Sequence, residues 1–232
     1  MKKTVFFEQI IAGAILKFKT ITNVDIVILA NLLIQKGYNI EDYEIDDCKK
    51  YNDSCTRKVI LDNDSNLDDY ILINDKSIRL FDWLLEIQGN DLKNFFDSLD
   101  LKIFTLKKVK YFGYVSCDLV NYLFSEIQTN ELIDLIKKGY LMVSWNNDIP
   151  HEDFKQITLT KSGKVQLFKF DHFDKLNEFK KELIKLNYDV NLIEKFLEKQ
   201  DLQLLTNEIL SLENFTYYCN KFDRNPYVKT IF

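Results

Sequence analysis

The 232-residue sequence contains few glycines and prolines, six and two respectively. Folds made of many short strands need these residues at their turns, so their scarcity disfavours a β-sandwich or a barrel. Helices make no such demand, and the turns here must rely on asparagine, aspartate and serine. The composition therefore favours a helix-rich fold in which strands are few.

Arginine is also scarce. Only Arg57, Arg79 and Arg224 accompany an abundance of lysine, asparagine and isoleucine, a bias typical of the AT-rich genome of a phage or bacterium. Arginine is the usual bidentate partner of phosphate and guanine, so its scarcity weakens any expectation of nucleic-acid binding. The net charge of −5 points the same way, because phosphate contacts supply much of the affinity for nucleic acids.

Motifs that carry chemistry are missing as well. Four cysteines and two histidines are spread along the chain without the close spacing of a zinc site or a disulfide framework. There is no glycine-rich phosphate loop and no nucleophile elbow. No apolar run is long enough to span a bilayer, and the N-terminal residues read as an amphipathic helix rather than a secretory signal. We therefore predict a cytoplasmic, non-enzymatic protein with no metal or cofactor.

Two features that hint at chemistry have plainer explanations. Residues 62–68 space oxygen ligands as a calcium loop does, but Leu67 stands where such a loop needs glycine and Ile73 where it needs glutamate. A solvated acidic turn accounts for this stretch better. His151 follows Pro150 in a predicted hairpin tip, where exposure is normal and no pocket is implied.

The most informative feature is a helix ending that occurs twice. Gly37 and Gly139 each follow a lysine, precede a tyrosine and close an apolar, helix-like run. Glycine just past a helix end takes the left-handed conformation that lets the last carbonyls accept hydrogen bonds, and lysine there suits the helix dipole. We therefore expect positive φ at both glycines. Helices are predicted over residues 5–19, 24–36, 78–88, 91–99, 117–127, 130–138 and from 174 onward.

Alternating segments follow the second ending. Leu141, Val143 and Trp145 alternate with Met142 and Ser144 before a polar turn, which is a half-buried strand pattern. Residues 157–160 then alternate apolar with polar side chains, so a β-hairpin is predicted. Helix, glycine and hairpin, over residues 116–168, resemble the winged-helix domains of bacterial regulators. Residues 5–85 are similar to a degenerate first copy that contains an acidic insertion, 41–69. We predict an α-rich α+β fold with tandem winged-helix-like modules and a C-terminal helical layer.

Other segments complete the expected organisation. Residues 102–114 read as extended, with apolar side chains at Ile103, Phe104, Leu106 and Val109. The domains are expected over residues 1–90, 91–170 and 171–232.

Charge suggests what the chain binds. The segment 41–69 holds ten acidic and four basic residues, the strongest imbalance in the chain. The electric field of such an acidic segment speeds association with a basic partner, although a merely solvated loop would have the same composition. The winged-helix resemblance adds that acidic domains of this kind often serve as interaction platforms. We therefore predict a non-catalytic protein-binding module, such as an inhibitor, immunity protein or regulator. The expected acidic contacts are Glu41, Asp42, Glu44, Asp46 and Asp47.

The alternative is a winged-helix transcriptional regulator that binds DNA. In such domains the helix before the hairpin enters the major groove and the wing touches phosphates. The predicted helix over residues 130–138 has no net charge, which disfavours this alternative. The phosphate contacts would then come from Lys107, Lys108, Lys110, Lys137, Lys138, Lys155, Lys161 and Lys164.

Overall fold

The computed structural model describes residues 3–41, 59–60, 91–146, 154–199, 211 and 213–217. Contacts within the chain divide it into an N-terminal unit, Met1–Thr158, and a C-terminal unit, Leu159–Phe232. Helices predominate and the strands form small sheets, so the predicted α-rich α+β class is confirmed. In the described ranges, no helix is both long enough and apolar enough to cross a bilayer.

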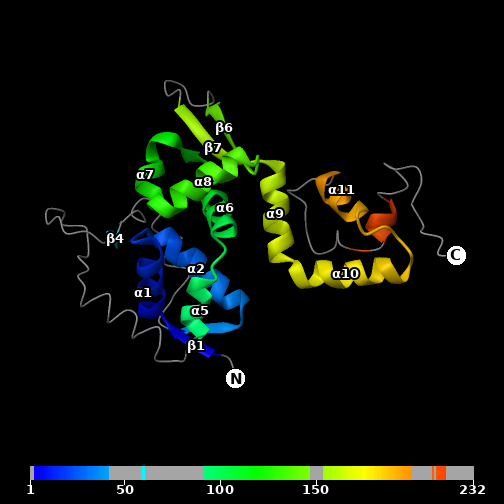
Figure 1. Ribbon diagram of the computed structural model, residues 1–232, viewed down its shortest axis with the longest axis horizontal. Coiled ribbons are helices and arrows are strands. Elements are labelled where there is room, and N and C mark those ends of the chain that lie inside the picture. The colour runs from blue at the N-terminus through cyan, green and yellow to red at the C-terminus, as the bar shows by residue number, and fades with distance from the viewer. Residues whose placement is uncertain are drawn as a thin grey trace. The chain divides into compact units, whose positions relative to one another are not determined.

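The N-terminal unit begins with two helices, each preceded by a short strand (Figure 1). β1 pairs in parallel with β3, and β2 pairs antiparallel with β4. The helices predicted over residues 5–19 and 24–36 are confirmed as α1 and α2. The elements are β1 (Lys3–Phe6), α1 (Phe7–Phe18), β2 (Thr20–Ile21), α2 (Asn23–Gln35), β3 (Tyr38–Glu41) and β4 (Val59–Ile60).

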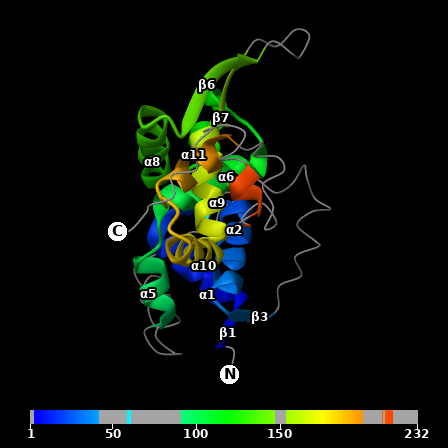
Figure 2. The same cartoon turned by 90° about the vertical axis from the view of Figure 1, so that its right-hand side faces the viewer.

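The second half of this unit consists of helices followed by a β-hairpin. The three strands form one sheet in the order β5–β7–β6, and β5 runs antiparallel to β7 with Val115 opposite Ile157. In Figure 2 the strands β6 and β7 extend beyond the helices of this unit. The elements are α5 (Asp91–Asp97), α6 (Leu101–Phe112), β5 (Val115–Ser116), a 3-10 turn (Cys117–Leu119), α7 (Val120–Leu123), α8 (Glu126–Lys137), β6 (Leu141–Asn146) and β7 (Phe154–Leu159).

The two halves share one core. α2 is buried on most sides and packs against α1, β3 and α6, while α6 packs against α8. α1 also packs against α5, where Gly13 lies so close to the Phe96 ring that a Cβ atom there would be 2.1 Å from it. Residues before and after the acidic segment therefore belong to one folded body.

The predicted glycine endings are confirmed. Gly37 has φ +87° and Gly139 has φ +74°. At the end of α8, the Tyr140 N–H donates to the Leu135 carbonyl at 2.9 Å, and the Gly139 N–H donates to the Ile136 carbonyl at 3.0 Å. These bonds satisfy carbonyls that the helix leaves without partners. The hairpin expected after Gly139 is confirmed as β6 and β7.

Two sequence predictions are wrong. Residues 102–114 are not extended, because α6 covers most of them; Asp100 caps this helix by accepting from the Ile103 N–H at 3.1 Å, and Gly113 ends it with φ +77°. The side chains of α6 are buried on more than one side, which hid the helical period. Only α7 and a short 3-10 turn lie between Cys117 and Leu123, and α8 begins after Ser125 rather than at residue 130.

The C-terminal unit is a small helical assembly. Thr160 caps α9 by accepting from the Gly163 N–H at 3.1 Å. Its core joins residues of all three helices with Phe215. The elements are α9 (Lys161–Asp171), α10 (Phe173–Lys185) and α11 (Leu192–Lys199).

The observed division differs from the three predicted domains. Residues 1–158 fall in one unit, in which α2 packs against α6. α9 groups with α10 and α11, because Val165 and Phe168 lie in their core. The helix expected at 78–88 lies outside the described residues, as do the calcium-like stretch 62–68 and His151.

Candidate interaction site

The helix α8 begins with a reciprocal cap. Ser125 Oγ accepts from the Gln128 N–H at 3.3 Å, and Gln128 Oε1 accepts from the Ser125 N–H at 3.1 Å. This Ser-x-x-Gln arrangement is a capping box, which satisfies two backbone donors at the start of the helix. The start of α8 is therefore determined by its local sequence.

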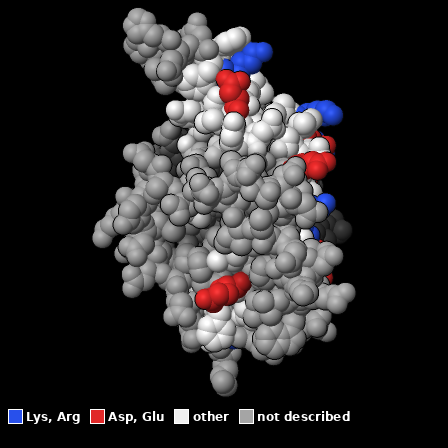
Figure 3. Space-filling model, turned by 90° about the vertical axis from the view of Figure 1, so that its left-hand side faces the viewer, with Lys and Arg blue, Asp and Glu red and all other residues white. Residues whose placement is uncertain are grey.

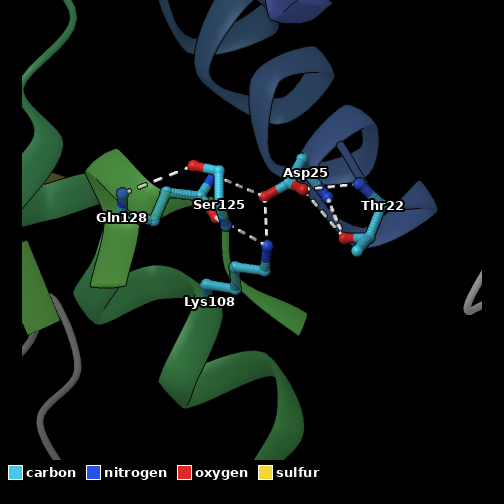
Figure 4. A network of polar contacts seen from close by, with 5 residues as sticks. All are labelled: Thr22, Asp25, Lys108, Ser125 and Gln128. Carbon is cyan, nitrogen blue, oxygen red and sulfur yellow. Dashed lines mark hydrogen bonds and ion pairs between the residues drawn. The ribbon is translucent and has the colours of Figure 1, made fainter. Parts of the chain in front are cut away.

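A buried polar network connects α8 to α6 and α2 (Figure 4). The Lys108 ammonium donates to Asp25 Oδ1 at 2.5 Å and to Gln128 Oε1 at 3.0 Å. The Gln128 amide donates to Asp25 Oδ1 at 3.0 Å. Asp25 Oδ2 accepts from the Thr22 N–H at 2.6 Å and from the Thr22 hydroxyl at 2.9 Å. One network thus spans three helices of the N-terminal unit.

The opposite side of α8 faces solvent. Glu126, Asn130, Ile133 and Lys137 are all exposed, and their spacing places them on one stripe of the helix. Ile133 is 45% exposed, and Ile127, on the flank of this stripe, is 36% exposed. Two branched apolar side chains therefore face water on one twelve-residue helix.

The hairpin beside α8 also exposes apolar side chains. Met142, Val143 and Trp145 of β6 are exposed, and the Lys155 ammonium lies 5.3 Å from the centre of the Trp145 ring. β6 packs against α8 in the same unit. Exposed apolar side chains are therefore present on both α8 and β6.

Acidic and basic groups are mixed around α8. Lys138 forms an ion pair with Asp134 at 2.5 Å, and the Lys102 ammonium lies 4.2 Å from the centre of the Tyr140 ring. Burial raises the pKa of the Glu131 carboxyl, and the nearby carboxylate of Asp134 raises it further. On the face shown in Figure 3 the described acidic and basic side chains are likewise scattered among uncharged surface. The described surface there has no patch of one sign.

The predicted phosphate contacts are distributed over several elements of both units. Lys108 is wholly buried beside Asp25, so its ammonium is not available to a phosphate and this assignment is wrong. Lys107 and Lys110 lie one turn apart on α6, and Lys137 and Lys138 lie at the end of α8. The remaining lysines are exposed on β7 (Lys155) and on α9 of the other unit (Lys161 and Lys164).

The predicted acidic contacts lie largely beyond the described residues. Glu41 ends β3, and Asp42, Glu44, Asp46 and Asp47 fall outside the described ranges. Sequence reasoning missed Asp25, Gln128 and the exposed isoleucines. Thr22-x-x-Asp25 and Ser125-x-x-Gln128 both have the spacing of a capping box, a signal that would have located the start of α8.

Among the described residues, no three of histidine, cysteine, aspartate and glutamate are grouped so that they would hold an ion. Comparison of the chain with protein-family models, curated proteins and solved structures finds no match.

Proposed function

We propose that this chain is a non-catalytic module that acts through protein–protein contacts, as a regulator, inhibitor or immunity protein, and that its N-terminal unit is winged-helix-like. The order α6, β5, α7, α8, β6 and β7 supports this, together with a sheet in which β7 lies between β5 and β6. Winged-helix domains have this succession of helices and strands, with the helix before the hairpin exposed for binding.

The observation that carries the proposal is the solvent face of α8. A helix that reads DNA needs cationic or hydrogen-bonding side chains directed at phosphates and base edges. α8 and its cap residue instead carry three acidic residues, Glu126, Glu131 and Asp134, against Lys137 and Lys138, a net charge of −1. Ile127 and Ile133 stand exposed between these charges. Apolar side chains among mixed charges suit a protein surface better than a phosphate backbone.

The same proposal covers the acidic segment. A basic partner would be drawn to Glu41, Asp42, Glu44, Asp46 and Asp47, because opposite charges speed encounter at low salt. In this scheme the acidic segment steers the partner and apolar contacts elsewhere hold it.

Titration of labelled duplex DNA with the full chain at physiological salt tests the proposal. We expect weak, strongly salt-dependent binding with no sequence preference. A sub-micromolar, sequence-selective complex would contradict the proposal and favour the DNA-binding regulator instead. In that event a K137E/K138E variant should lose the complex, whereas K175E/K185E, which reverses two exposed lysines on α10, should retain it.

A further inference from the structure

The exposed stripe of α8 is complementary in charge to itself. It begins with Glu126 and ends with Lys137, and Asn130 and Ile133 lie between them. All four side chains are exposed, and the spacings of four, three and four residues keep them on one side of the helix. A second helix with the same stripe, laid antiparallel, would meet each acidic end with a basic end.

We propose that this face of α8 binds the same face of a second copy of the chain, with the two helices antiparallel about a twofold axis. The inference rests on the proposed function and assigns a partner to the α8 face alone; the basic partner of the acidic segment is a separate molecule. Glu126 of each copy then lies opposite Lys137 of the other, and Ile133 lies opposite Asn130. Because a twofold interface repeats every contact, two Glu126–Lys137 pairs flank two central Ile133 side chains.

The charges on the exposed face of α8 favour a second copy of the chain over other binding partners. Nucleic acid would be repelled by Glu126 and by the partly buried Glu131. A partner that is uniformly basic would be repelled by Lys137 and Lys138 at the end of the helix. In an antiparallel copy, Glu126 of each chain faces Lys137 of the other, so both charged ends of the stripe meet the opposite sign.

The size of the face sets the expected strength. α8 has twelve residues, so the stripe is about 18 Å long. A single helix pair of this length buries less surface than a standard stable interface. We therefore expect a monomer–dimer equilibrium with a dissociation constant on the order of 10 µM.

Sedimentation equilibrium of the full chain, over a concentration series that brackets this constant, tests the proposal. Ile133→Glu should weaken dimerisation at least tenfold, because it places two like charges at the centre of the contact. Ile184→Glu is the matched control, since it makes the same change at an isoleucine of α10 that is 60% exposed, and it should leave dimerisation unchanged. A wild-type chain that stays monomeric, or an unchanged dimer in Ile133→Glu, overturns the proposal.

A charge swap tests the antiparallel arrangement. Glu126→Lys and Lys137→Glu should each weaken dimerisation, because each brings like charges together twice. The double variant E126K/K137E restores opposite charges across the twofold axis and should recover most of the lost affinity. It also opposes the helix dipole at both ends of α8, so its melting temperature should fall at least as far as that of either single variant. Recovered dimerisation with lowered stability cannot come from a merely structural effect.

The outcomes also separate this inference from the proposed function. A double variant that fails to recover dimerisation overturns the antiparallel pairing and leaves the protein-binding proposal standing. A wild-type chain that stays monomeric and binds no duplex DNA likewise overturns the self-association and leaves the protein-binding proposal standing. Tight, selective DNA binding contradicts the proposed function itself, whatever the oligomeric state.

Discussion

The Lys108 ammonium lies 2.5 Å from Asp25 Oδ1, and neither side chain is more than 1% exposed to solvent. A buried charge is tolerated only when it is paired and its hydrogen-bonding capacity is used. Gln128 and Thr22 supply the additional bonds in this case. The pair therefore joins α2 to α6, and all of its hydrogen bonds form only when the two helices pack in this arrangement.

We predict that breaking this pair is costly. Asp25→Asn removes the carboxylate that pairs with the buried Lys108 ammonium and should lower the free energy of unfolding by about 3–5 kcal/mol. Lys108→Met should cost less, because the Asp25 carboxylate keeps three donors from Thr22 and Gln128. Chemical denaturation of both variants measures the difference.

The double variant D25N/K108M is the informative control for that prediction. With both charges removed, neither is left uncompensated, so its loss of stability should be smaller than the sum of the two single losses. Lys138→Met removes one member of an exposed pair and should cost less than about 1 kcal/mol. Additive losses in the double variant would show that the two charges do not interact.

Close packing between α1 and α5 gives a second prediction. Alanine normally stabilises a helix relative to glycine by about 1 kcal/mol. At Gly13 the added Cβ would lie 2.1 Å from the Phe96 ring, so Gly13→Ala should instead destabilise the protein, by about 1–3 kcal/mol. Thermal melting should show that G13A/F96L is more stable than additivity of the single variants requires, because the smaller side chain relieves the clash.

The end of α8 gives a third prediction. Gly139 has φ +74° and no neighbour within 4 Å of an added Cβ, so a side chain there is opposed only by the backbone conformation. Gly139→Ala should cost about 1 kcal/mol, and Gly139→Asn should cost less, because asparagine tolerates the left-handed region better. Equal melting temperatures for the wild type and Gly139→Ala would contradict this explanation.

The raised pKa of Glu131 gives a fourth prediction. Its pKa in the folded protein lies above the ordinary value of 4.5, chiefly because of burial, so the folded state binds more protons than the unfolded state just above that value. Stability contributed by the protonated form is therefore lost as the pH rises through the folded pKa. Glu131→Gln should raise the melting temperature slightly at neutral pH and should not raise it below the ordinary glutamate pKa. A gain that is the same at both pH values would contradict the assignment.

The sequence by itself determined the helix endings and the hairpin. Gly37 and Gly139 have positive φ because only a residue without a side chain takes that conformation freely, a property of the local chain. The strands β6 and β7 follow from alternation of apolar and polar residues, which is also local. These features needed no knowledge of which other parts of the chain lie nearby.

Only the tertiary structure shows that residues 101–112 form a helix and that Lys108 in it is buried. The prediction of an extended segment over 102–114 is wrong, because α6 is buried on several sides and shows no single apolar stripe. Lys108 seemed a surface cation by type, yet its partners Asp25 and Gln128 are 83 and 20 positions away in the chain. Sequence patterns report the period of one segment, whereas the environment of a charge depends on what packs against it. Because Lys108 is buried and the stripe from Glu126 to Lys137 is exposed, α8 is a better candidate interaction surface than the lysines of α6.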